Sequence, residues 1–185
     1  MARRLLTVTM ILALGILVGC GGSGDSGDSA GTADTPAAAP IPEWFTSPDK
    51  VVEGLMVAYR TRNDSLYSAL LAEDFRYYFV PPGADSSDIL GWGKLEDLGA
   101  TSNLFRTPDV QVLSLELQAA PSRDAADHPE WKMVPVAGGE LRVEVADKEA
   151  MQVMLNRQEI YVRQDPASSR WQVIAWYDYP DPEAP

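Results

Sequence analysis

The stretch QVMLNRQEIYVRQDPASSRWQVIAWYD, residues 152–178, decides the fold. Its two ends, about Gln152 to Arg163 and Arg170 to Asp178, are rich in the β-branched and aromatic residues that favour strands. Between them, residues 165–169 combine Asp, Pro and Ser, which is typical of a hairpin loop. We therefore expect two long antiparallel strands at the end of the folded region.

Shorter strands precede this hairpin. In the segment from Val110 to Leu117, leucines recur at every second position from Leu113 on, which places them on one side of a strand. The segments from Trp131 to Val136 and from Leu141 to Val145 flank Ala137-Gly138-Gly139, which predicts a turn. A first strand is expected at Phe75 to Val80, where Pro81 stops it.

Three helices are expected before most of these strands. Ser47 can cap the first, and Asn63 or Asp64 can cap a shorter second helix that ends near Ala72. A third follows Trp92 and breaks before Pro108. One face of the first helix is apolar: Val51, Val52, Leu55, Met56 and Tyr59. Helices followed by a run of antiparallel strands predict an α+β fold.

The N-terminus has the pattern of a secretory signal. Arg3 and Arg4 precede a largely apolar run from Leu5 to Gly19, which is shorter than the ~20 residues that span a bilayer. The quartet Leu17-Val18-Gly19-Cys20 resembles the lipobox of bacterial lipoproteins. The resemblance implies that residues 1–19 are a signal peptide and that Cys20 is the lipid-attachment site.

Lipidation would anchor the protein to a membrane of the cell envelope. Two or more acyl chains together hold a membrane firmly. In bacterial lipoproteins an aspartate after the cysteine tends to retain the protein in the inner membrane; Gly21 stands there in this chain, so the resemblance implies the outer membrane, facing the periplasm. Residues 20–42 hold mostly small and polar residues and predict a disordered tether. Residues 43–180 would form one domain, followed by a loose tail at 181–185.

Composition excludes several classes of function. The formal net charge of −12 argues against nucleic acid as a partner. The single cysteine permits no disulfide within the chain, and we expect no metal and no cofactor because their motifs are absent from the sequence. His128 is the only histidine and lies in a polar, acidic run, which predicts a solvated loop residue.

Four segments resemble the nuclear transport factor 2-like superfamily, which includes SnoaL-type cyclases and ketosteroid isomerases. They are Pro48 to Val52, Ala58 to Asp64, Leu70 to Phe75 and Trp171 to Asp178. The resemblance implies a cone-shaped, cystatin-like fold with N-terminal helices packed on a strongly bent antiparallel sheet. Bends are expected near residues 156–159 and 173–174, where strand alternation lapses.

Such a cone would enclose a ligand pocket. Candidate lining residues are mostly aromatic: Tyr59, Phe75, Tyr77, Phe79, Trp92, Phe105, Tyr161, Trp176 and Asp178. Tyr77, Tyr161 and Asp178 have side chains suited to acid–base chemistry, but the sequence around them does not match the ketosteroid isomerases. We therefore assign no catalytic residue.

The sequence favours a lipid-anchored binding module of the cell envelope. It would hold a small apolar ligand in the cone pocket, or a homodimer or envelope protein partner on the sheet face. The first alternative is an isomerase or dehydratase acting on an apolar carbonyl compound, which requires a carboxylate facing the pocket. The second is a structural subunit for envelope assembly.

Overall fold

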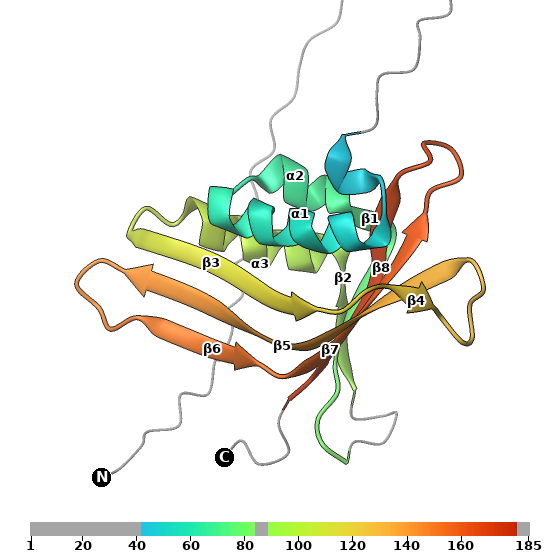
Figure 1. Ribbon diagram of the computed structural model, residues 1–185. Helices are drawn as coiled ribbons and strands as arrows, with labels where there is room; N and C mark the ends of the chain where they lie inside the picture. The colour runs from blue at the N-terminus through green and yellow to red at the C-terminus, as the bar shows by residue number, and fades with distance from the viewer. Residues whose placement is uncertain (1–41, 84–88, 181–185) are drawn as a thin grey trace, which may run out of the picture. The chain divides into compact units, whose positions relative to one another are not determined.

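Helices cover one face of a strongly curved sheet (Figure 1). The computed structural model describes residues 42–83 and 89–180. The expected signal peptide, Cys20, nearly all of the tether and the tail lie outside these residues. We call the sheet face under the helices the inner face and the opposite one the outer face.

The helices begin where the sequence predicts. The side chain of Ser47 accepts a hydrogen bond from the Lys50 amide, and that of Asn63 accepts one from the Leu66 amide. Both caps satisfy amides that a helix leaves unpaired at its start. The helical segments are η1 (Glu43–Phe45), α1 (Pro48–Thr61), α2 (Asp64–Leu70) and α3 (Lys94–Arg106).

The strands form one sheet in the order β2-β1-β8-β7-β5-β3, and β4 and β6 also pair with β5. Their bounds are β1 (Leu71–Phe79), β2 (Leu90–Gly93), β3 (Val110–Ala119), β4 (Arg123–Asp124), β5 (Trp131–Val145), β6 (Met151–Leu155), β7 (Arg157–Gln164) and β8 (Trp171–Tyr179). The α+β class and the bent sheet are confirmed. Most pairs are antiparallel as expected, but β1 and β8 run parallel.

The turn expected at Ala137-Gly138-Gly139 is wrong, because β5 continues through it. Gly139 lies opposite Leu117 of β3, and a Cβ there would stand 2.3 Å from the Glu116 carbonyl oxygen. The glycine therefore permits a close approach of two strands. The long strand expected from Gln152 to Arg163 is instead divided at Asn156, where the chain passes from one half of β5 to the other.

The bend expected near residues 173–174 is confirmed. Tyr161 pairs with Ala175, whereas the next residue, Val162, pairs with Val173. Ile174 is thus an extra residue in β8, which is a bulge that curves the strand.

The core lies between the helices and the inner face. Side chains without solvent exposure come from both layers, for example Val51 and Leu55 of α1 and Ile160 and Val173 of the sheet. Trp176, 6% exposed, belongs to the same cluster. No helix in this part of the chain has the length and apolar character needed to cross a bilayer.

Candidate functional site

The inner face carries a group of three hydrogen-bonded polar side chains, one from each of three neighbouring strands. Tyr77 of β1 donates its hydroxyl to Asp178 Oδ2 of β8 at 2.8 Å, and Gln158 Nε2 of β7 donates to Asp178 Oδ1 at 3.3 Å. Burial, reinforced by the Asp178 charge, raises the pKa of Tyr77. Tyr77 therefore stays protonated and serves as a hydrogen-bond donor.

A second inner group surrounds Asp97 of α3. Its carboxylate accepts from the Tyr67 hydroxyl at 2.7 Å and from Trp92 Nε1 at 3.0 Å. Burial raises the pKa of Asp97, although both hydrogen bonds oppose the shift. Trp92 stacks on Tyr77 at a centroid distance of 4.3 Å, so the two inner groups are in contact.

Two buried polar atoms of the inner face have no partner among the described residues. They are Oε1 of Gln158, a residue 1% exposed, and Nε1 of Trp176. An unpaired buried polar atom is costly, so native structures usually satisfy it with protein or water. A water or a small polar molecule would satisfy both kinds of atom.

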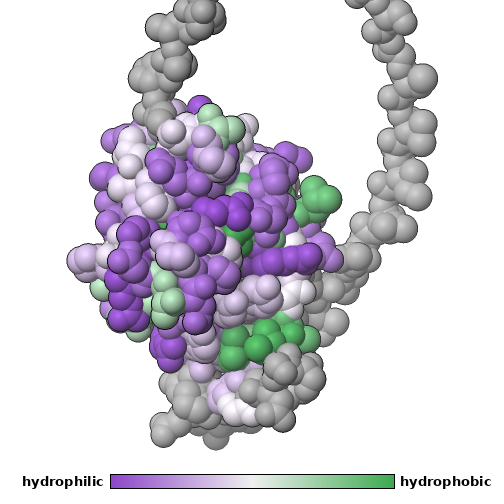
Figure 2. Space-filling view, turned by 90° about the vertical axis from the view of Figure 1, so that its right-hand side faces the viewer, coloured by the Kyte–Doolittle hydropathy of each residue, from purple (hydrophilic) through white to green (hydrophobic). Residues whose placement is uncertain are grey.

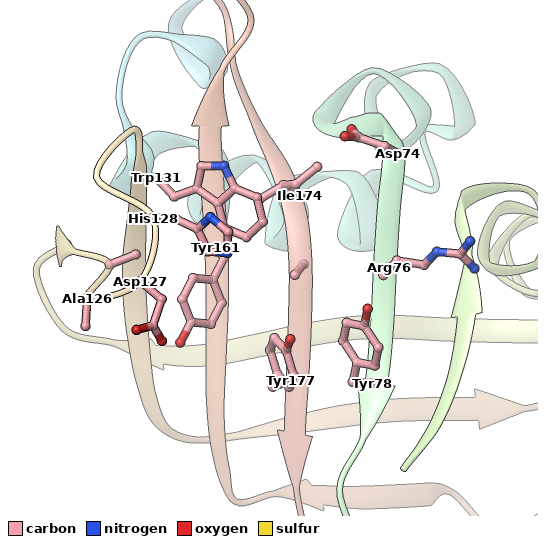
Figure 3. Close-up of a pocket in the computed structure, with 12 residues that line it drawn as sticks. Asp74, Arg76, Tyr78, Ala126, Asp127, His128, Trp131, Tyr161, Ile174 and Tyr177 are labelled. Carbon is pink, nitrogen blue, oxygen red and sulfur yellow. The ribbon is translucent and has the colours of Figure 1, made fainter. Parts of the chain in front are cut away.

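The outer face holds a pocket of about 420 Å³ (Figure 3). Successive strand residues point to opposite faces, so Asp74, Arg76 and Tyr78 of β1 face outward while Phe75 and Tyr77 face the helices. The other lining residues are Ala125, Ala126, Asp127, His128, Trp131, Tyr161, Ile174, Ala175 and Tyr177. We call this the outer-face pocket.

Aromatic rings form much of its wall. Tyr161 lies 6.3 Å from Trp131 and 5.6 Å from Tyr177, at interplanar angles of 67° and 72°. His128 stacks on Trp131 at 3.9 Å, and Tyr78 stacks on Tyr177 at 4.6 Å. The rings are fixed by one another and by the strands that carry them.

Charged side chains surround these rings. Asp74 is paired with Arg163 of β7 through contacts of 2.9 and 3.1 Å. Asp127 also lines the pocket, whereas Arg76 extends away from the rings (Figure 3). Burial is the largest cause that raises the pKa of Tyr161, to about 12, so its hydroxyl remains a donor.

A second hollow, of about 520 Å³, lies beside α2 and α3. Two of its three cations already have acidic partners: Lys94 contacts Glu73 and Arg106 contacts Asp64, each at 2.7 Å, while Arg170 lies over the ring of Phe45. Because these acidic partners offset positive charge, the hollow is a weak candidate for an anion site. Among the described residues, no three His, Cys, Asp or Glu side chains gather where they could hold a metal ion.

The predicted pocket residues divide between three environments. Tyr161 lines the outer-face pocket. Tyr77, Trp92 and Asp178 form the inner polar groups, and Phe79 ends the same strand as Tyr77. The remaining four pack in or against the core: Tyr59, Phe75, Phe105 and Trp176.

Sequence reasoning missed most of the outer-face pocket. His128 is half-exposed in the loop before β5, in line with a solvated loop residue, but its ring also stacks on Trp131 and lines the pocket. Alternation along β1 and β8 was a usable signal, because Tyr78 and Tyr177 must face away from Tyr77 and Trp176. The stacking of His128 on Trp131 had no signal in the sequence.

Comparison with known proteins supports the fold. No known family's sequence profile matches the chain, and no curated protein sequence matches it. A conserved protein from Planctomyces limnophilus DSM 3776 is 14% identical in sequence, with a TM-score of 0.54 over 71% of this chain and 91% of that one. A ketosteroid isomerase-like protein from Erwinia carotovora atroseptica SCRI1043 is also 14% identical, with a TM-score of 0.50 over 75% and 97%.

A third similar structure is an NTF2-like protein of unknown function in nutrient uptake from Rhodospirillum rubrum ATCC 11170. It is 22% identical, with a TM-score of 0.48 over 71% of this chain and 95% of that one. The similarity to the structure from Erwinia carotovora atroseptica shows that the chain has a ketosteroid isomerase-like fold. This fold hosts many activities, so function must be argued from the sites.

Proposed function

We propose that this protein is a ligand-binding module, held at the cell envelope by a lipid on Cys20, and that its ligand binds in the outer-face pocket. One observation carries the proposal: four aromatic side chains and two carboxylates border a 420 Å³ pocket on central strands of the sheet. Pockets of this size hold small molecules, and strands position side chains more precisely than loops do.

The pocket supports binding through its construction. Ile174 and Ala175 of β8 form an apolar floor, and Trp131 and Tyr161 form one wall. The loop from Ala125 to His128, which joins β4 to β5, closes the adjacent side. An apolar ligand face would lie against the floor and rings, while polar ligand groups would meet the charged rim. The face of the molecule in Figure 2 is mostly hydrophilic, with a few hydrophobic patches.

The binding test uses a pair of exposed alanines. Ala126 lines the pocket, so Ala126→Trp should fill it, whereas Ala120→Trp changes an exposed residue outside the lining. A fragment screen by ligand-observed NMR should find compounds that bind wild type and Ala120→Trp but not Ala126→Trp. The proposal fails if every bound compound also binds Ala126→Trp, or if none binds the wild type.

The anchoring test is independent of the pocket. Cys20→Ser should move the protein from the membrane fraction to the soluble fraction, since acyl chains would be its main attachment. A variant that still sediments with membranes would place the anchor elsewhere.

A second candidate function is an isomerase or dehydratase acting on an apolar carbonyl compound. It is favoured by Asp178, a carboxylate that faces inward beside a protonated tyrosine, Tyr77. Such an enzyme should catalyse hydrogen–deuterium exchange next to the carbonyl of an apolar ketone. Asp178→Asn should abolish the exchange, and Glu159→Gln, on the outer face, should not; absence of exchange across a ketone series would remove this candidate.

A further inference from the structure

We propose that the ligand of the outer-face pocket is an organic cation, an amine or quaternary ammonium group with apolar substituents. This inference rests on the proposed function, because it names the chemical class that the same pocket would take. It is carried by the arrangement of three rings, by the carboxylates next to them and by the charge of the whole chain.

Trp131, Tyr161 and Tyr177, which we call the ring box, all line the outer-face pocket. Tyr161 is steeply inclined to both neighbours, at 67° and 72°, while His128 stacks on Trp131 and Tyr78 stacks on Tyr177. The negative face of an aromatic ring attracts a cation within about 6 Å of its centroid, and tryptophan and tyrosine are the strongest of these partners. Several rings around one space therefore suit a soft, poorly hydrated cation.

The charges that face this box favour the same sign of ligand. Asp127 and Asp74 both line the pocket with these rings, and Arg163 offsets part of the charge of Asp74. The lining arginine, Arg76, directs its side chain away from the rings. His128 also lines the pocket, where its ring stacks on Trp131 and its Nδ1 lies 3.7 Å from a Glu130 carboxylate oxygen.

The whole chain adds to this preference. A formal net charge of −12 attracts cations and repels anions, which raises the local concentration and association rate of a cationic ligand. A neutral ligand with the same shape would gain the ring contacts without the cation–π attraction. An anionic ligand would approach Asp127 and Asp74 against their charge.

The test compares choline with its uncharged carbon analogue, in which a tert-butyl group replaces the trimethylammonium group. Full-length protein, purified in a non-ionic detergent, is titrated with each compound at millimolar concentration and followed by calorimetry and NMR. We expect choline to bind and the analogue to bind at least about tenfold more weakly, since the two differ almost only in charge.

Two pairs of variants locate the effect. Asp127→Asn should weaken choline binding severalfold, while Asp124→Asn, the same change at an exposed residue outside the pocket, should not. Tyr161→Leu should weaken choline binding, and Tyr161→Phe, which keeps the ring, should retain it. Each variant is compared by circular dichroism with the wild type, and the Phe variant shows whether a loss comes from the ring.

Each outcome decides the inference. Equal or tighter binding of the uncharged analogue, or equal losses in Asp127→Asn and Asp124→Asn, would overturn it. So would the absence of choline binding in the wild type. The proposed function would survive these results if the fragment screen still found compounds that bind the wild type but not Ala126→Trp. The two failures are therefore distinguishable.

Discussion

Trp176 offers the sharpest test of the fold, because it is buried and yet leaves its indole N–H without a partner among the described residues. A buried aromatic side chain removes about 150–250 Å² from water, which corresponds to about 4–6 kcal/mol. Alanine keeps about 1 kcal/mol of this. The unpaired N–H already costs the wild type about 1–3 kcal/mol. We therefore expect Trp176→Ala to reduce the free energy of unfolding by about 2 kcal/mol.

The unpaired N–H predicts a different result for phenylalanine. Trp176→Phe loses part of the apolar area but also removes the unsatisfied donor, so its unfolding free energy should stay within about 1 kcal/mol of wild type. Urea titrations followed by circular dichroism would measure both variants, with His128→Ala, at a half-exposed position, as a control expected to change little. If Trp176→Phe were as damaging as Trp176→Ala, the N–H would have a partner. A stable Trp176→Ala beside an unstable His128→Ala would refute the packing argument.

Three further changes test separate features in the same assay. Gly139→Ala should cost about 1–3 kcal/mol, because its methyl group would meet the Glu116 carbonyl oxygen at 2.3 Å. Gly99→Ala, in an exposed turn of α3 with open space around it, should instead stabilise by about 0.5–1 kcal/mol. Burial raises the pKa of Asp97, so the folded state holds this proton more tightly than the unfolded chain. Protonated Asp97 therefore contributes its full stabilisation below pH about 4, and this stabilisation is lost as the pH rises through the raised pKa. In Asp97→Asn the urea midpoint should no longer fall over that pH range.

The helices and most strands could be predicted because their signals are local. Caps at Ser47 and Asn63 and the apolar face of α1 depend on residues within a few positions of one another. The turn predicted at Gly138-Gly139 was wrong because glycine is common both in turns and where two strands approach closely. Only the pairing with β3, a separate segment of the chain, distinguishes the two cases. The parallel pairing of β1 with β8 likewise depends on a contact between distant segments.

The candidate site was harder to predict because its parts come from separate segments. Residues of the polar loop at 125–128 meet strands β1, β7 and β8, whose positions depend on the whole topology. The sequence did mark a bend at Val173-Ile174, and that bulge is next to the pocket floor. Aromatic content pointed to a ligand pocket, but the same residue types also build the core, where Phe75 and Phe105 lie.

Alternation along β8 separates stability from binding. Trp176 and Asp178 face the helices, whereas Tyr177 lies between them in sequence and faces the outer-face pocket. Changes at Trp176 should therefore alter unfolding with little direct effect on the pocket rings, while Tyr177 makes its ring contacts with Tyr78 and Tyr161 on the opposite side. The Ile174 bulge sets where alternation resumes, so it determines that Trp176 faces the core and Tyr177 the pocket. The residues that shape the bend therefore place the side chains of both faces.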